Sequence, residues 1–373
     1  MLEKIDNLCL VIAFPLVLAI PLLMLCTGFG PKRASTEKRL MAQAPVLTWK
    51  REALSTYPAD FEAFFNDHFG TRNVLIAMKQ RLSVFVFRDS PEEKVVIGKD
   101  DWLFFSSSIT VRPPSDEEFY NQRATKLSDR RAWLAEFQIP YLFVLAPQKP
   151  FVYPEYLVDY HQKVLVPSPA QTFTTAMEER GLDWVVNLEA VLLEQKAETL
   201  LFFRTDTHWN ALGALLAYRH MAHQMAPLLE GFQPLLYEDL DLPLVQRNGG
   251  DLANMLGLLN EMKEHSYLLP TKYPFQFCIT EAAPAYKEDA LPAHQQPVSW
   301  ICAGRPYKVL VLHDSFTTAL KPYIAMNFGH TIFVWDRLNE EAFQRLVLRE
   351  KPDLVIEERV SRVHSLTMMF GKP

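Results

Sequence analysis

Short apolar runs alternate with helical patterns along most of the chain, and this alternation restricts the fold more than any other feature. The runs predicted to be strands lie at 141–147, 184–188, 307–312, 331–335 and 353–358. Apolar residues recur at helical spacing over 126–137, 170–180, 210–225, 317–326 and 340–349. Because a short strand without polar alternation is buried on both faces, the pattern predicts an α/β fold with a parallel sheet and helices on both faces.

The region before this alternation has a different pattern. Residues 57–87 carry apolar side chains at helical spacing, and residues 94–105 read as two short strands around a turn at 98–101. Residues 230–300 are rich in Pro and loop formers and support no prediction. We therefore expect a membrane anchor at 1–30, a linker and helical segment at 31–90, and a catalytic domain at 91–373.

Residues 8–29 carry no charge, and these 22 positions are enough for a helix that spans about 30 Å of hydrocarbon. This predicts an N-terminal transmembrane helix, with a cleavable signal peptide as the alternative. Lys32, Arg33, Lys38 and Arg39 follow the run, and these cations would hold the domain after it in the cytoplasm.

Composition excludes some functions. The net charge is −6 and no long run of like charges is present, so nucleic acid is not an expected partner. No phosphate-binding glycine loop and no metal-ligand motif occurs, so we expect neither a cofactor nor a metal. Outside the apolar run, Cys278 and Cys302 have no His partners at zinc spacing; two unlinked buried thiols are favoured, with a disulfide as the alternative.

Ser315 follows the strand predicted at 307–312 and precedes a predicted helix. A serine at such a turn is presented at the edge of the sheet, where helix N-terminal amides can receive a developing oxyanion. Ligand sites of parallel sheets lie at this edge, beyond the carboxyl ends of the strands. The alternative is a plain helix N-cap, which serine also fills well.

Asp206 and His208 lie in the segment FFRTDTHWN, between an apolar run and a helix. In extended backbone, side chains two positions apart point to the same side. The aspartate could then orient the imidazole, whose other nitrogen would act as a base toward a serine. The alternative is that Asp206 or Thr207 caps the helix near Asn210, with His208 merely packed.

Several stretches together resemble the AlgJ/AlgX-like alginate O-acetyltransferase family, whose catalytic domain is a permuted SGNH-hydrolase fold. The resemblance covers about residues 57–360. Its stretches are FNDHFGTR, VVIGKDDWLFF, APQKPFVYPEYL, DTHWNALGA, GGDLANMLGL, HDSF and KPDLVIEERVSR. The DTHW element followed about 100 residues later by HDSF is the most specific part. One departure is His313, where the family usually has glycine two positions before the serine.

The resemblance implies that Asp206, His208 and Ser315 form a catalytic triad. It also implies an acetyl-serine intermediate, an exopolysaccharide acceptor such as alginate, and a multi-pass membrane O-acyltransferase partner that supplies the acetyl group. The expected location is the inner membrane, with a single span and the catalytic domain in the periplasm. The alternatives are a carbohydrate esterase or deacetylase with the same triad, and a non-catalytic scaffold subunit of a synthesis complex.

Other polar and aromatic residues receive secondary roles. The residues predicted to bind substrate are Lys149, Tyr153, Trp209 and Arg204. Gly249, Gly250 and Asp251 are expected to form a structural turn, and the adjacent acids Glu357 and Glu358 a solvated strand end.

Overall fold

The structure is a computed structural model. It describes residues 42–47, 49, 51–68, 72–237, 240, 242–269, 278–283, 296–335, 338–362 and 366, together with Pro15, Ala19 and Leu23. Contacts divide the chain into two compact units, 1–91 with 256–258 and 92–255 with 259–373. Most of the predicted anchor at 8–29 lies outside the described residues. In the part that is described, no helix is both long and apolar enough to cross a bilayer.

The smaller unit is helical in its described part. It contains α2 (Arg51–His68), α3 (Arg72–Arg81) and a single π-helical turn, η1 (Leu82–Val86). The carboxylate of Asp67 near the end of α2 accepts a hydrogen bond from the backbone N–H of Ala42. These elements occupy the segment for which apolar spacing predicted helix.

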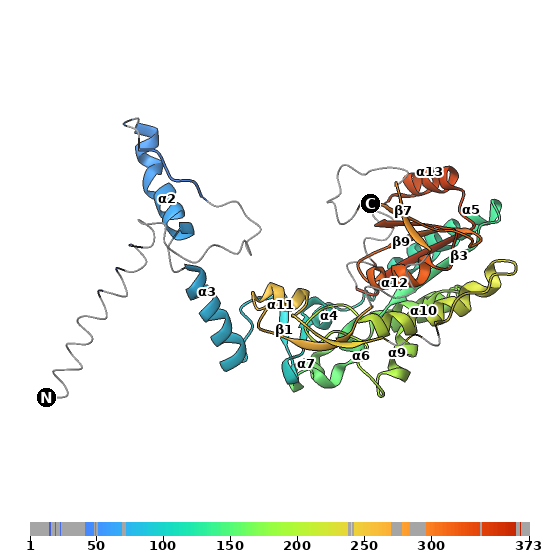
Figure 1. Cartoon of the computed structure of the whole chain (residues 1–373), viewed down its shortest axis with the longest axis horizontal. Helices are drawn as coiled ribbons and strands as arrows, with labels where there is room; N and C mark the ends of the chain where they lie inside the picture. Colours follow the sequence, from blue (N-terminus) through green and yellow to red (C-terminus); the bar gives the residue numbers. More distant parts are fainter. Residues whose placement is uncertain are drawn as a thin grey trace. The chain divides into compact units, whose positions relative to one another are not determined.

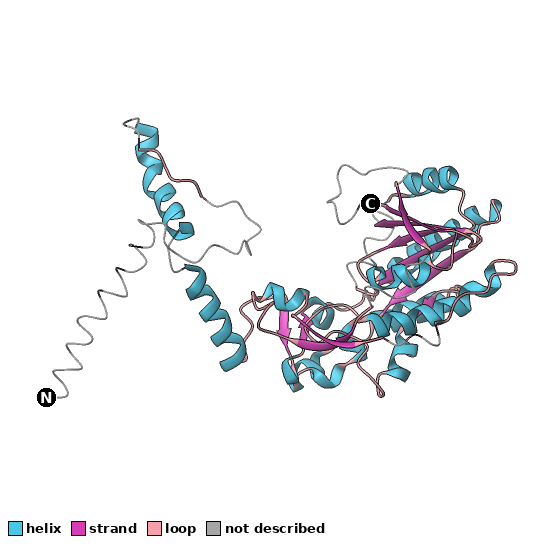
Figure 2. Cartoon of the chain, in the orientation of Figure 1, coloured by secondary structure: helices cyan, strands magenta, loops and turns pink. Residues whose placement is uncertain are grey.

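A seven-stranded sheet forms the centre of the larger unit (Figures 1 and 2). In spatial order its strands are β4 (Val186–Asn187), β3 (Tyr141–Ala146), β11 (Leu354–Val360), β9 (Lys308–His313), β10 (His330–Trp335), β8 (Val298–Cys302) and β7 (Ile279–Ala282). The first five run parallel, as predicted, but β8 runs antiparallel to both of its neighbours, β10 and β7. The expectation of a purely parallel sheet is therefore wrong at this edge. Both strands are partly exposed, so they lack the continuous apolar runs that marked the buried strands.

Helices cover both faces of the sheet, and Figure 1 shows α13 and α5 on one side with α12 and α10 on the other. Successive side chains of β3 pack alternately against the two layers, as the period of a strand requires. One layer contains α5 (Glu117–Glu136), α8 (Pro169–Glu178) and α13 (Glu340–Glu350). The other contains α9 (Glu189–Gln195), α10 (Ala211–Met225) and α12 (Thr317–Ala325).

Smaller elements surround the sheet. Two antiparallel ribbons join β1 (Val95–Ile97) to β2 (Leu103–Phe105) and β5 (Leu244–Arg247) to β6 (Glu264–Tyr267). The short helices are η2 (Lys99–Asp101), α4 (Ser107–Thr110), α6 (Lys149–Val152), η3 (Pro154–Tyr156), α7 (Asp159–Val164), η4 (Ala226–Leu228) and α11 (Asp251–Met255).

Two predictions about side chains are wrong. Cys278 and Cys302 are joined in a disulfide that ties the residue before β7 to the end of β8, rather than remaining unlinked thiols. Glu357 and Glu358 are fully buried rather than solvated. Glu357 is compensated by ion pairs with Arg130 and Arg359, which explains how strand β11 can carry a charge through the core.

Candidate active site

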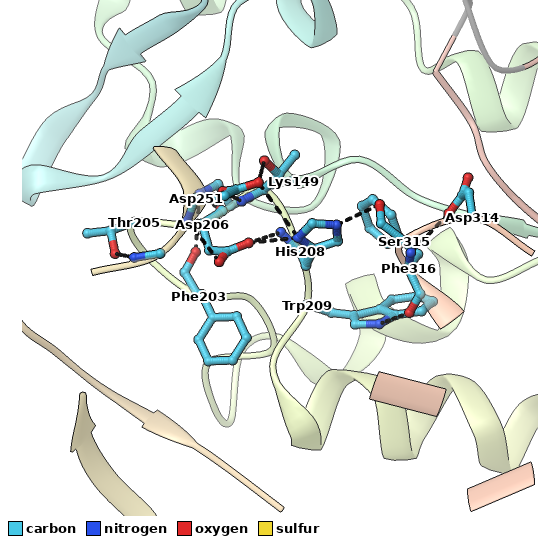
Figure 3. A network of polar contacts seen from close by, with 12 residues as sticks. Lys149, Phe203, Thr205, Asp206, His208, Trp209, Asp251, Asp314, Ser315 and Phe316 are labelled. Atoms are coloured by element: carbon cyan, nitrogen blue, oxygen red, sulfur yellow. Dashed lines mark hydrogen bonds and ion pairs between the residues drawn. The ribbon is translucent and has the colours of Figure 1, made fainter. Parts of the chain in front are cut away.

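Asp206, His208 and Ser315 form one continuous hydrogen-bonded chain (Figure 3). The Nδ1 of His208 lies 2.7 Å from Oδ1 of Asp206, and its Nε2 lies 2.8 Å from Oγ of Ser315. Because an ionised carboxylate can only accept, the ring proton belongs on Nδ1. The other ring nitrogen is then free to accept the hydroxyl hydrogen of Ser315, the arrangement of a serine nucleophile with its base.

The backbone that carries Asp206 and His208 is a tight loop and not the extended segment expected from the sequence. The loop is closed by an isolated bridge between Phe202 and Trp209. Within it, Oδ1 of Asp206 accepts the backbone N–H of His208 at 3.0 Å, which is an Asx-type turn. The carboxylate thus reaches the imidazole because the chain bends around it, not because the two side chains share one side of a strand.

Neither Asp206 nor Thr207 caps the helix that follows. Asn210 fills that position, and its side-chain oxygen accepts the N–H groups of Leu212 and Gly213. Thr207 instead binds the carboxylate of Asp251 through both its N–H and its hydroxyl, at 2.7 and 2.6 Å. The capping alternative for this segment is therefore wrong, and the two residues remain available to the site.

The second oxygen of Asp206 is held by the start of α11. Its Oδ2 accepts the backbone N–H of Asp251 at 3.1 Å. The preceding residue, Gly250, donates its N–H to the hydroxyl of Thr205, which itself binds Glu264 on β6. The turn at 249–251 was expected to be structural, and its backbone fixes the orientation of the Asp206 carboxylate.

Ser315 lies in the turn between β9 and α12 and does not act as the side-chain cap of that helix. Its hydroxyl points to His208, while its carbonyl accepts the N–H of Thr318. The neighbouring Asp314 accepts the N–H groups of Phe316 and Val360 at 2.9 and 2.7 Å. This carboxylate ties the serine turn to the end of β11.

Charges in the site stabilise an imidazolium. Burial alone would lower the pKa of His208, but the hydrogen bond and charge of Asp206, with further help from Asp251 and Asp314, raise it. Burial also opposes ionisation of Asp206, yet its bonds to His208 hold the pKa of this carboxyl well below its usual range. An ionised aspartate behind a basic imidazole is what proton removal from a serine requires.

The three side chains Lys149, Tyr153 and Trp209, predicted to contact substrate, are buried at 2%, 2% and 0% exposure. The ammonium of Lys149 donates to the backbone carbonyls of Phe203, Arg204 and Asp206. These three bonds hold the loop that carries the triad. Lys149 therefore positions the site instead of lining a substrate groove.

Tyr153 and Trp209 are likewise structural. The hydroxyl of Tyr153 accepts the N–H of Leu201 and donates to the carbonyl of Thr199. The indole N–H of Trp209 donates to the carbonyl of Phe316, which links the loop of His208 to the turn of Ser315. Trp209 borders the cavity over the triad, but its side chain has 0% exposure and packs edge-on against Phe316, so a sugar ring has no open face to stack on.

Arg204 contacts β6 and the residue before it and is not among the residues that line the cavity over the triad. Its guanidinium donates to the carbonyl of Lys263, and its backbone N–H donates to Glu264. The prediction that it holds an anionic substrate group is not supported by these contacts, since the guanidinium is engaged with the protein.

A cavity of about 450 Å³ opens over the triad. Its walls are Phe203, Asp206, His208, Trp209, Arg247, Leu268, Ser315, Phe316, Thr318 and Ala319. Arg247 was missed because it lies in the segment 230–300, where the sequence offered no regular pattern. Its guanidinium stacks on the ring of Phe203 at 4.1 Å and brings a positive charge to the wall of the cavity.

Asp206, His208 and Asp251 offer three possible metal-ligand atoms within 4.8 Å of one another. Their contacts are explained without a metal. Nδ1 of His208 is bonded to Asp206, and both oxygens of Asp251 accept hydrogen bonds from Thr207. A metal at this point would displace the bond that orients the imidazole.

His313 does not crowd the serine. Its ring is 2% exposed and packs edge-on against Phe333 and Trp335, with centroids 6.0 and 5.6 Å away. Burial, together with the charge of Lys321, lowers the pKa of His313 to about 3. The side chain that replaces the expected glycine is thus a neutral packing group, and it is absent from the described wall of the cavity.

Gly250 provides a test of the contact behind Asp206. A Cβ at this position would lie 2.3 Å from the Cβ of Asp206 and 2.4 Å from its Oδ2. We expect Gly250→Ala to push the aspartate off the imidazole and to lower turnover by about 10²-fold or more, since the aspartate fixes the histidine tautomer. Steady-state kinetics with an activated acetyl ester would measure the loss, and turnover unchanged by the substitution would contradict this placement.

The model of the SGNH hydrolase-like domain of acetyltransferase AlgX matches residues 95–307, more than half of the chain. The chain belongs to this family. The matched segment includes Asp206 and His208 and ends before Ser315. The evidence that Ser315 belongs to the site is therefore its hydrogen bond with His208 and not this match.

Curated relatives are named probable alginate O-acetylase AlgJ. The protein from Pseudomonas aeruginosa is 27% identical over 242 residues, which cover 63% of this chain and 57% of the relative. The protein from Azotobacter vinelandii is 25% identical over 201 residues, covering 53% and 50%. The chain therefore spans about half the length of these relatives.

Solved structures share the fold. Bacillus cereus PatB1 with a sulfonyl adduct aligns with a TM-score of 0.54 and 17% identity, covering 74% of this chain and 97% of that one. A DHHW family protein from Eubacterium siraeum aligns with a TM-score of 0.50 and 16% identity, covering 75% and 96%. At such identities the likeness shows a shared α/β fold.

Proposed function

We propose that this protein is a serine-dependent O-acetyltransferase that acetylates hydroxyl groups of an exopolysaccharide. The observation that carries the proposal is the unbroken chain from Asp206 through His208 to Ser315 beside an open cavity. Family membership and the printed names of the AlgJ relatives support the choice of acetyl group and polysaccharide. An alginate-like acceptor is part of the proposal.

In the first step, His208 removes the hydroxyl proton of Ser315 while its Oγ attacks the carbonyl carbon of an acetyl donor. His208 then returns this proton to the leaving group, and an acetyl-serine remains. The backbone N–H of Ser315 has no hydrogen-bond acceptor within the described residues. We assign it the role of donor to the oxyanion that forms when Oγ attacks the acetyl carbonyl. The N–H of Phe316 is not available for this role because Asp314 already accepts it.

In the second step, a sugar hydroxyl enters the cavity and gives its proton to His208 as its oxygen attacks the acetyl carbon. Collapse of the tetrahedral species transfers the acetyl group, and the same proton returns to Ser315. The acyl donor is proposed to reach the enzyme from a multi-pass membrane O-acyltransferase partner. In this arrangement the uncharged run at 8–29 anchors the chain in the inner membrane, with the catalytic domain in the periplasm.

Transfer is distinguished from hydrolysis by the fate of the acetyl group. The purified protein would be incubated with an activated acetyl ester, with and without an oligouronate, and the products analysed by mass spectrometry. We expect a mass increase of the sugar by one acetyl group, lost in Ser315→Ala. Release of free acetate at the same rate with and without sugar would instead identify an esterase, and no reaction at all would leave a scaffold role.

A further inference from the structure

Two carboxyl groups lie together behind the turn that carries Ser315. Asp314 directly precedes the serine, and Glu358 lies on the neighbouring strand β11 with no exposed surface. The backbone N–H of Asp314 is 3.5 Å from Oε2 of Glu358. The mechanism proposed above uses neither side chain, so the burial of Glu358 against a half-buried Asp314 beside the nucleophile requires an explanation.

Hydrogen-bond donors are distributed unequally between the two acids. Each oxygen of Asp314 accepts a backbone N–H, from Phe316 and from Val360. Oε2 of Glu358 accepts the hydroxyl of Thr317 at 2.8 Å, whereas its buried Oε1 has no partner among the described residues. A fully buried carboxylate is normally stabilised at both oxygens, so Asp314 is built to be an anion and Glu358 is not.

We propose that Asp314 and Glu358 hold one proton between them and act as a positioning pair for Ser315. The proton belongs to Glu358 and is directed at the Asp314 carboxylate. The pair then binds Phe316, Thr317 and Val360 at once, which fixes the serine turn against β11. This inference rests on the proposed acyl transfer for only one of its two readouts, the reactivity of Ser315. The other readout is resistance to urea across pH.

Other charged groups near the pair do not replace the proton. Arg359 and Arg362 act on Asp314 from β11 and the segment after it, but the Arg359 guanidinium is bonded to Glu357. Burial lowers the pKa of Arg359 to about 10, so it stays a cation up to weakly alkaline pH. His313 is neutral over the same range, and Asp314 also helps to raise the pKa of His208.

The direction of the pH effect follows from the environment of Glu358. Burial, and then the charge of Asp314, raise the pKa of Glu358 well above its usual range. The pair is intact below this folded-state pKa and loses its proton above it. The contribution of the pair to the free energy of unfolding is therefore fully present below the ordinary glutamate pKa. It is lost as the pH rises through the folded-state pKa of Glu358. Ser315 should lose reactivity as the pH rises through the same folded-state pKa.

The test compares two substitutions of Glu358 in the full chain. Glutamine reproduces a protonated acid because its amide can donate to Asp314, whereas alanine removes the group. We expect labelling of Ser315 by a fluorophosphonate at pH 7 to stay within about threefold of wild type for Glu358→Gln and to fall at least about tenfold for Glu358→Ala. Glu358→Gln should also remove the loss of labelling and of urea resistance that accompanies deprotonation of Glu358, and leave only the loss that deprotonation of Lys149 causes near its pKa of about 8.

Glu189 at the start of α9 supplies a matched control, because it is also buried and burial raises its pKa, yet it binds Ser168 at the start of α8. Glu189→Gln should retain the wild-type pH profile of Ser315 labelling. Equal losses in Glu358→Gln and Glu358→Ala, or a wild-type profile in Glu358→Gln, would overturn the shared proton. If wild-type Ser315 resists labelling, the proposed function fails, and the urea series across pH still decides whether the pair holds a proton.

Discussion

Replacing Ser315 or His208 with alanine is expected to lower turnover by roughly 10⁴-fold, the loss typical of removing one member of a serine triad. Ser315→Ala removes the oxygen that would carry the acetyl group. His208→Ala removes the acceptor of its proton, which lies 2.8 Å from that oxygen. Both variants should fold, because the two side chains are partly exposed and their removal leaves the core unchanged.

A second serine–histidine pair in the same domain serves as the control. Oγ of Ser299 on β8 and Nε2 of His330 on β10 are 2.6 Å apart, and burial lowers the pKa of His330. Ser299→Ala should keep turnover within about threefold of wild type, since the pair lies outside the cavity wall. Circular dichroism would establish that the variants are folded. Turnover within tenfold of wild type in Ser315→Ala or His208→Ala would end the assignment of the nucleophile and its base.

The strands that position the site could be predicted because a strand buried on both faces is a continuous apolar run in the sequence. The apolar runs at 141–147 and 307–312 each precede a site residue, and the carboxyl ends of such strands lie at one edge of a sheet. Strands β7 and β8 could not be found in the same way. They lie at the edge, they are partly exposed, and their side chains mix polar and apolar residues.

The identities of the triad residues could be anticipated, but not the contacts that hold them. The bend at Asp206 depends on where Gly250 and Asp251 lie, which local sequence does not reveal. Lys149 follows a predicted strand, which suggested that it lines a substrate groove. Glu358 lies near the end of another predicted strand, which suggested that its side chain is solvated. Both are buried because distant segments pack over them, and spacing along the chain carries no information about that.

Removing the ammonium of Lys149 should damage both stability and catalysis. Its Nζ lies 3.1 Å from the carbonyls of Phe203 and Arg204 and 2.6 Å from that of Asp206. Lys149→Met would fill similar volume and leave the carbonyls of Phe203 and Asp206 without their donor, whereas that of Arg204 keeps the backbone N–H of Leu103. Burial lowers the pKa of Lys149 to about 8, which reflects a desolvation cost that the substitution recovers. With each unpaired buried carbonyl costing about 1–3 kcal/mol, we expect a net loss of about 3 kcal/mol in unfolding free energy.

Turnover of Lys149→Met should fall by about 10²-fold as well, because the freed loop carries Asp206 and His208 away from Ser315. Lys196 provides a comparison of the same chemistry away from the site. It donates to the carbonyl of Val152 and to Glu155, and its side chain is more exposed. Lys196→Met should lose less than about 1 kcal/mol and keep its turnover. Urea unfolding and ester kinetics on both variants separate the two cases, and a fully active, fully stable Lys149→Met would mean that the triad loop holds its shape without this cation.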